Sequence, residues 1–493
     1  MTERPGVGRL WGGSPPPRSD VTYDAVVVVP GLMGSELRDA EDGRLLWGIS
    51  PRLLEQMWQN PLTLQDLHLT PRERAGSYGR VRATALLRVP SWAPIFQGFE
   101  PYAALCRTVG DAVADPRALL AFPYDWRLPV EYNGGLLAQA ARRHLEAWTA
   151  AAASEPALRR LWDRPPRLVF VAHSMGGLVT LAALERHRDL LPDTRTVITL
   201  GTPFLGSAKA AVVLNGDRGS RIPRRVVRRL QALAATLPGV HELLPDFRCV
   251  DRGLEAGRLD PPTVEAIGGD RELASAVQAR QTRMRSPGAA ALPDHRAVVG
   301  VGQETVQGIR VDGAVVTPRF EAFLTHSDGH LRRDAHGVPE RRDRQGDGTV
   351  YRDAAHRGAA GPVYLPVQHG ALAGNETVLR YVHAVLTEYD DRVGPPMGSG
   401  ELGVVVPDEG VTAGDPWEVR VTGRTEAAGA SCVLTDADTG RQVARGRLSA
   451  RDDGLRATLA APAPGLFRVS VTAGGVAPVT QLVMAHGPGE AAG

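Results

Sequence analysis

A serine stands at the apex of a strand–turn–helix pattern in residues 169–177, which read Val-Phe-Val-Ala-His-Ser-Met-Gly-Gly. This pattern is typical of a nucleophile elbow, in which a tight turn exposes a serine hydroxyl above the edge of a sheet. Small residues two positions before and after the serine let strand and helix approach closely, and here they are Ala172 and Gly176. The alternative is a chance A-x-S-x-G at a strand end. We expect Ser174 to be a catalytic nucleophile.

A serine hydroxyl attacks a carbonyl when a base removes its proton, and that base needs an acid to hold its tautomer. In this fold the acid and then the base follow the serine along the chain. Asp347 lies between two glycines in a turn that can aim a carboxylate, so it is the candidate acid. An ordinary Asp-Gly turn is the alternative reading, and Asp343 and Asp353 are competitors for the role.

The candidate base is His369, which follows an apolar run at 363–365 and precedes the last helix of the domain. A surface histidine is the alternative interpretation. His173 adjoins the nucleophile on a tight turn, and we interpret it as structural. The remaining candidates sit in polar loops that precede or crowd the acid, and they are His326, His330, His336 and His356.

Acyl transfer also needs hydrogen-bond donors aimed at the developing oxyanion. One backbone N–H is expected from the residue after the nucleophile, Met175, and a second from the loop after an early strand. Residues 30–35 read Pro-Gly-Leu-Met-Gly-Ser and form that loop, from which we choose the N–H of Leu32. A Gly-rich turn without a role is the alternative.

Strands and helices alternate around these residues. Short apolar runs rich in β-branched residues predict buried strands at 25–29, 168–172, 195–200, 297–301 and 363–365. Helical patterns occupy 136–153, 177–187 and 376–388. This alternation favours an α/β fold with a parallel sheet covered on both faces. A less regular, mostly helical block between sheet strands, at 215–295, is typical of a cap insertion.

The composition of the 493 residues changes near the C-terminal end of the chain. A Gly- and Pro-rich linker at 393–401 is followed by short alternating runs separated by turn residues at 402–487, which predict an Ig-like β-sandwich. Such a module binds a partner or packs by default. Residues 1–21 are predicted to be a flexible arm.

Charge and cysteine content exclude several classes of protein. The formal net charge is +2, which gives no reason to expect a nucleic-acid partner. The 3 cysteines fit neither a metal site nor a disulfide framework, and we expect no metal and no cofactor. No apolar run approaches the ~18 residues of a membrane span, and the N-terminal residues lack the apolar core of a signal peptide. A cytoplasmic protein is the expectation.

Several motifs together resemble the lecithin:cholesterol acyltransferase family, which includes phospholipid:diacylglycerol acyltransferases and lysosomal phospholipase A2. Pro-Tyr-Asp-Trp-Arg at 123–127 is the most specific of them, since generic α/β-hydrolases lack it. The others are Val-Pro-Gly-Leu-Met-Gly-Ser at 29–35, Leu-Trp-Gly at 46–48, the serine motif at 172–176, Gly-Thr-Pro-Phe-Leu-Gly-Ser at 201–207, Gly-Asp-Gly-Thr-Val at 346–350 and Gln-His at 368–369.

The resemblance implies an α/β-hydrolase domain at 22–392 with a mobile lid near 47–69 and a helical cap at roughly 207–295. Trp47 in the lid and Trp126 in the Pro-Tyr-Asp-Trp-Arg motif become candidate lid and substrate residues. Family members pass an acyl chain from a phospholipid to an alcohol or to water, so a lipid ester is the expected substrate and peripheral membrane contact is expected with it. The lid segment has no cysteine, unlike that of the secreted members, which makes transfer to water more plausible.

Two other readings stay open. One is an esterase or lipase that uses the same triad on small soluble esters. The other is an effector hydrolase whose Ig-like module binds a protein partner.

Overall fold

The computed structural model describes residues 21–48, 65–88, 91–93, 97–99, 101–155, 164–216, 224–286, 291–326, 329–359, 361–388, 402–407, 410–474 and 476–487. The expected arm, the linker and most of the expected lid, at 49–64, lie outside these residues. Within the described part of the chain, no helix combines the length and the apolar character that crossing a membrane requires.

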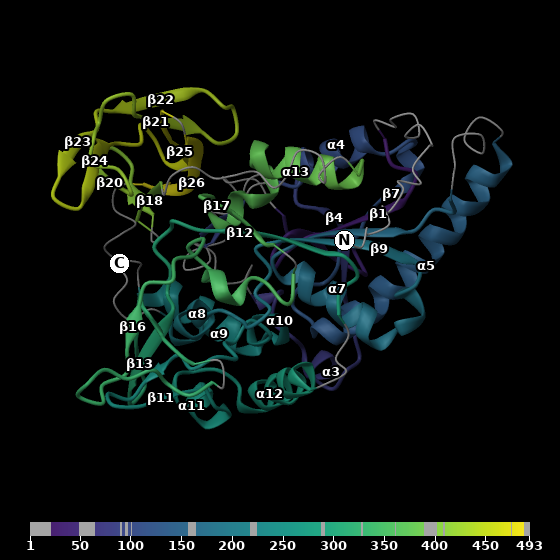
Figure 1. Cartoon of the computed structure of the whole chain (residues 1–493), viewed down its shortest axis with the longest axis horizontal. Coiled ribbons are helices and arrows are strands. Elements are labelled where there is room, and N and C mark those ends of the chain that lie inside the picture. The colour runs from purple at the N-terminus through teal and green to yellow at the C-terminus, as the bar shows by residue number, and fades with distance from the viewer. Residues whose placement is uncertain are drawn as a thin grey trace, which may run out of the picture.

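A parallel sheet of six strands forms the centre of the larger unit, in the order β17-β12-β9-β8-β1-β7 (Figure 1). The strands are β1 (Ala25–Val29), β7 (Leu119–Ala121), β8 (Leu168–His173), β9 (Thr194–Leu200), β12 (His295–Gly300) and β17 (Val363–Leu365). Every residue of β1 and β8 is buried, because helices cover both faces of the sheet. The coarse prediction of an α/β-hydrolase-type parallel sheet with helices is confirmed.

Two helix pairs cover the sheet. Helix α5 (Val130–Ser154) packs on α7 (Met175–Arg186), while α4 (Ala103–Ala112) packs on α13 (Glu376–Leu386). Figure 1 shows α4 and α13 on one side of the strands and α7 on the other. Four short 3-10 helices join the elements, at Pro116–Ala118, Arg188–Leu190 and Arg352–Ala354 and, as η4, at His369–Gly374.

The expected cap region is partly helical. Its helices are α8 (Ala208–Asn215), α9 (Arg224–Thr236), α10 (Pro238–His241), α11 (Pro261–Ala266) and α12 (Arg271–Arg285). It also contains β10 (Val250–Asp251) and β11 (Ala256–Gly257), which join β13 (Gly308–Asp312) and β14 (Val315–Arg319) in a four-stranded sheet. The block expected to be mostly helical thus also contains two short strands, and β10 pairs in parallel with β13, a strand that follows β12.

Smaller elements surround the sheet. A three-stranded antiparallel sheet contains β2 (Ser35–Asp39), β3 (Leu45–Trp47) and β4 (Val81–Leu86), with the one-turn helix α3 (Pro71–Arg74) between β3 and β4. Two hairpins are formed by β5 (Ser91–Ala93) with β6 (Gln97–Phe99), and by β15 (Ala322–Phe323) with β16 (Arg341–Arg342).

The C-terminal residues form two β-sheets that enclose one apolar core. One sheet has the order β18-β20-β24-β23 and the other β19-β26-β25-β21-β22. Their strands are β18 (Gly403–Val405), β19 (Val411–Thr412), β20 (Trp417–Thr422), β21 (Ser431–Asp436), β22 (Gln442–Gly446), β23 (Ser449–Arg451), β24 (Gly454–Leu459), β25 (Gly465–Ala473) and β26 (Val476–His486). Val421 from the first sheet and Val469 from the second are both fully buried in this core. Figure 1 shows this unit in yellow beside β12 and β17.

Candidate active site

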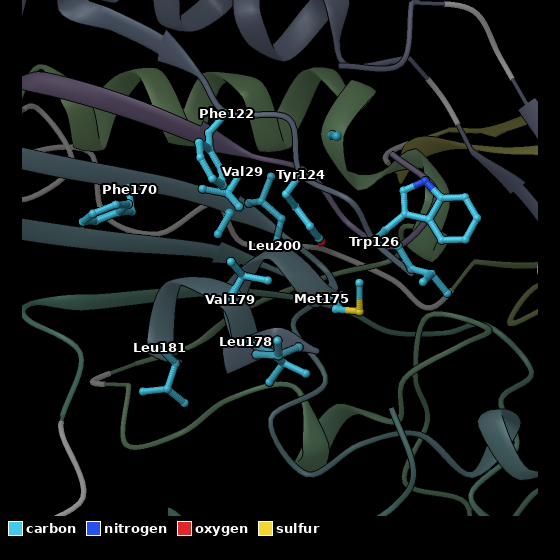
Figure 2. Close-up of a cluster of buried hydrophobic side chains, with 14 of the residues drawn as sticks. Val29, Phe122, Tyr124, Trp126, Phe170, Met175, Leu178, Val179, Leu181 and Leu200 are labelled. Carbon is cyan, nitrogen blue, oxygen red and sulfur yellow. The ribbon is translucent and has the colours of Figure 1, made fainter. Parts of the chain in front are cut away.

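The direction in which the chain adds strands reverses between β1 and β8. The chain passes from β1 outward to β7 and then returns across β1 to continue with β8, so the loops after β1 and β8 diverge at the carboxyl edge of the sheet. Crevices in open α/β sheets form at such a switch point. Figure 2 shows the buried side chains that fix this end of the sheet, with Val29 on β1 and Met175 and Val179 on α7.

Ser174 occupies the sharp turn between β8 and α7. Its φ of 52° lies in the left-handed region, which is costly for a residue with a side chain and is typical of a nucleophile elbow. Gly176 allows the turn to be this tight, since a Cβ there would lie 2.3 Å from the carbonyl oxygen of Pro30. The elbow predicted from the spacing of small residues is thus the local structure.

The structure brings Ser174, His369 and Asp347 into one hydrogen-bonded chain. Ser174 Oγ lies 2.8 Å from His369 Nε2, and His369 Nδ1 lies 2.8 Å from Asp347 Oδ2. The three residues come from the ends of β8, β17 and the loop after β16, and all are buried, with Ser174 retaining 7% exposure. A hydroxyl, an imidazole and a carboxylate in this order can move a proton from serine to histidine.

The turn around Asp347 aims the carboxylate. Oδ1 accepts hydrogen bonds from the backbone N–H groups of Thr349 and Val350, at 3.0 and 2.7 Å, which leaves Oδ2 toward the imidazole. The backbone N–H of His369 also donates to the Asp347 carbonyl at 2.8 Å. The acid and the base are therefore tied together through their backbones as well as their side chains.

The two competing carboxylates have other partners. Asp343 accepts hydrogen bonds from the Gln307 side chain and the Gln345 backbone, at 2.6 and 2.7 Å. Asp353 forms an ion pair with Arg344 at 2.8 Å. Of the competing histidines, His326, His330 and His336 are exposed and His356 is half-buried.

The loop after β1 meets the serine from the other side. A Cβ on Gly31 would lie 2.8 Å from Ser174 Cβ, so the loop backbone approaches the nucleophile closely. Leu32 follows in this loop, and Met175 is the first residue of α7, where an N–H has no partner within the helix. Among the described residues, neither backbone N–H donates to a protein acceptor.

Trp47 and Trp126, the candidate lid and substrate residues, are both buried. Their exposures are 1% and 2%, and their rings pack edge to face with centroids 5.6 Å apart. Trp47 Nε1 donates to the Met33 carbonyl at 2.8 Å, and Trp126 Nε1 donates to the Ser35 carbonyl at 3.3 Å. A buried indole needs an acceptor for its N–H, and here the acceptors belong to the loop after β1. In the structure Trp47, the candidate lid residue, is thus a core residue that supports this loop.

Tyr102 and His173 link the loop after β1 to the base. The Gly31 N–H donates to Tyr102 Oη at 2.8 Å, and Tyr102 Oη lies 2.7 Å from His173 Nδ1. His173 Nε2 lies 3.0 Å from the carbonyl oxygen of His369. Burial, followed by the neighbouring His369, lowers the pKa of His173 to about 3. A neutral His173 then donates from Nε2 to the carbonyl and accepts at Nδ1 from the tyrosine hydroxyl.

The Pro-Tyr-Asp-Trp-Arg motif has a structural explanation as well. Arg127 is fully buried and forms ion pairs with Asp125 at 2.7 Å and Glu73 at 2.9 Å. It also donates to the Leu67 carbonyl at 3.2 Å. Tyr124 Oη from the same motif donates to the Pro30 carbonyl at 2.9 Å. The motif thus joins the chain after the expected lid to the loop that faces the serine.

Comparison with known proteins gives matches to part of the chain. Residues 102–255 match the sequence family described as lecithin:cholesterol acyltransferase. A stretch of 103 residues is 35% identical to the human protein named lysosomal phospholipase A and acyltransferase. This stretch covers 20% of the chain and spans only 22% of that relative.

Solved structures resemble the chain more distantly. The complex titled Tle4-Tli4 is 14% identical with a TM-score of 0.44, over 74% of this chain and 96% of that one. A Bacillus licheniformis lipase in propeptide form is 12% identical with a TM-score of 0.29, over 96% and 94% of the two chains.

Proposed function

We propose that the chain is a serine-dependent lipid acyl hydrolase or O-acyltransferase, because residues 102–255 match the lecithin:cholesterol acyltransferase family. It takes an acyl chain from a phospholipid or another lipid ester onto Ser174 and passes it to water or to an alcohol. The observation that carries the proposal is the unbroken hydrogen-bonded chain from Ser174 through His369 to Asp347.

In the acylation step, His369 Nε2 takes the proton of the Ser174 hydroxyl while Oγ attacks the ester carbonyl. Asp347 holds the tautomer by accepting from Nδ1–H and stabilises the imidazolium that forms. The substrate oxygen becomes negative and faces the N–H groups of Leu32 and Met175, which are fixed before the reaction begins. His369 then gives its proton to the leaving alcohol, and the ester bond breaks.

Deacylation repeats these steps in reverse with a new nucleophile. Water or an alcohol gives its proton to His369 and attacks the acyl-serine, and collapse of the second tetrahedral intermediate restores the hydroxyl of Ser174. Water yields a free fatty acid, whereas an alcohol yields a new ester. The proton taken from water or the alcohol by His369 returns to Ser174 Oγ when the acyl–serine bond breaks.

A lipid substrate is favoured by the family match and by the relative whose name includes both phospholipase A and acyltransferase. The domain organisation proposed with this function is a hydrolase at 22–392, a linker at 393–401 and an Ig-like sandwich at 402–487. Two antiparallel-dominated sheets around one core support the sandwich assignment. A small-ester esterase remains the other outcome of the test below.

Purified protein should be assayed on phosphatidylcholine vesicles with and without a long-chain alcohol, and in parallel on a soluble short-chain ester. The proposal predicts release of fatty acid from vesicles, and formation of an alkyl ester when the acceptor alcohol is added. Ser174→Ala is the control and should abolish both products. Rapid cleavage of the soluble ester without any vesicle cleavage would reject the lipid substrate and leave an esterase.

A further inference from the structure

The segment that follows β12 supports the turn that carries the acid. The backbone N–H of Gln303 donates to the Gly346 carbonyl at 2.9 Å, and Gln303 forms an isolated parallel bridge with Asp347. Two residues further on, Thr305 Oγ1 accepts a hydrogen bond from the Gly348 N–H at 2.9 Å. The backbone on both sides of Asp347 is therefore held by residues 303–305.

The side chain of Gln303 reaches in the opposite direction, into the C-terminal sandwich. Its Nε2 donates to the Leu402 carbonyl at 3.0 Å, and its Oε1 accepts from the Val404 N–H at 3.0 Å. Gln303 is 4% exposed, and Leu402 and Val404 are buried with it. A carboxamide offers a donor and an acceptor together, so it satisfies two backbone groups of β18 that would otherwise be buried without partners.

Other contacts fix the sandwich at the same place. A Cβ on Gly403 would lie 2.2 Å from the Gly302 carbonyl oxygen, so the two backbones approach closely. Arg420 of β20 forms an ion pair with Glu304. Strand β26 also contacts η4, which begins at His369. The sandwich therefore meets both the segment that supports the acid and the helix η4 that begins at the base.

We propose that the C-terminal sandwich is part of the catalytic unit and that Gln303 is the positioning residue through which it holds Asp347. This inference rests on the triad roles proposed above and adds to them a role for the sandwich. One side chain joins β18 to the backbone partner of Asp347, so a shift of the sandwich moves the carboxylate relative to His369.

The first test is Gln303→Met in the full chain. This change keeps the length of the side chain and removes both the Nε2 donor and the Oε1 acceptor of the carboxamide. A displacement of about 1 Å in a catalytic group costs on the order of 100-fold in rate. We expect kcat on the chosen ester to fall by roughly 10- to 100-fold with KM unchanged. The matched control, Gln442→Met, alters an exposed glutamine of the same sandwich and should keep wild-type kcat.

A second variant acts from the sandwich side of the interface. Gly403→Ala places a methyl group against the Gly302 carbonyl and should lower kcat in the same way as Gln303→Met. Its control is Gly474→Ala, because a Cβ on Gly474 meets no atom within 4 Å. If Gln303→Met does not fold, Gly403→Ala carries the test from the sandwich side of the interface.

A double-mutant cycle separates positioning from general support. If Gln303 acts through Asp347, then Gln303→Met should cost less than about 3-fold when Asp347 is already Asn, because groups that act as a unit are not additive. A full 10- to 100-fold loss in both backgrounds would overturn the inference. Wild-type kcat in Gln303→Met and Gly403→Ala would also overturn it, and would leave the proposed function standing if Ser174→Ala is inactive. Activity in Ser174→Ala would instead reject the proposed function.

Discussion

At the scale of single residues, the hydrogen bonds around His173 have only one consistent set of directions. The His369 carbonyl can only accept and the Gly31 N–H can only donate, so Tyr102 must donate to Nδ1 of a neutral His173. The imidazole is fully enclosed, and its pKa is lowered to about 3. The loop that faces the oxyanion and the backbone of the base are thus joined by two buried side chains.

This arrangement predicts a pH-dependent stability. An unfolded histidine binds a proton near pH ~6.5, whereas folded His173 does so only near pH 3. Between these values the unfolded state holds more protons, so stability falls as the pH decreases and is level above ~6.5. In urea unfolding, the wild type should lose up to about 1.4 kcal/mol per pH unit more than His173→Gln in this window.

Four other histidines with lowered pKa, His68, His144, His241 and His295, contribute to the pH dependence of both proteins. The difference between wild type and variant therefore isolates His173. Equal slopes for the two proteins would mean that His173 accepts a proton in the folded state, and the proposed directions of its hydrogen bonds would be wrong.

A site residue can be predicted from the sequence when the pattern that marks it lies in its immediate sequence neighbours. Ser174, Asp347 and His369 each sit in a short pattern of glycines or at the end of an apolar run, and the structure brings these three together. Tyr102 lies 71 positions from each of its partners Gly31 and His173. Gln303 lies 101 positions from Val404. A single polar residue with such distant partners leaves no periodicity or spacing to recognise.

At the scale of elements, the strands that carry the site were the most predictable. β1 matches the apolar run at 25–29, because a strand buried on both faces needs such a run. β17 matches the run at 363–365, although Tyr364 of this edge strand is exposed. The three-residue strand β7 is too short to stand out. β10 and β13 belong to two segments that are far apart in the sequence, on either side of β12. The local sequence pattern of either segment does not predict that the two strands pair.

The buried position of Trp47 on β3 leads to an element-scale prediction. Trp47→Ala leaves a cavity beside Trp126 and removes the donor to the Met33 carbonyl, so the loop after β1 loses support. Truncation of a buried tryptophan costs about 3–5 kcal/mol. The free energy of unfolding should fall by that amount, and turnover of a soluble ester and of vesicles should fall in equal proportion.

The comparison needs a tryptophan elsewhere as a control. The control is Trp417→Ala, at the half-buried first position of β20. It should also leave the ratio of vesicle turnover to soluble-ester turnover unchanged, and it should lower each turnover rate less than Trp47→Ala does. A Trp47→Ala protein that cleaves the soluble ester normally but fails on vesicles would return Trp47 to the role of a lipid anchor.

At the scale of the whole molecule, the composition change near residue 393 predicted two structural units. The residues through which the two units contact each other could not be predicted from the sequence. The sandwich lies against residues 302–304, so a hydrogen-bonded interface connects it to the candidate acid. Interfaces between units consist of a few side chains from distant positions, and their composition resembles other protein surfaces.

The most direct test of the account concerns Ser174. The intact full-length protein is treated with a fluorophosphonate probe, and the labelled residue is located by peptide mass spectrometry, for wild type and Ser174→Ala side by side. The account predicts one label on Ser174 in the wild type, none in the variant, and a loss of ester turnover of roughly a million-fold in Ser174→Ala. A label on another residue that persists in Ser174→Ala, together with retained turnover, would contradict it.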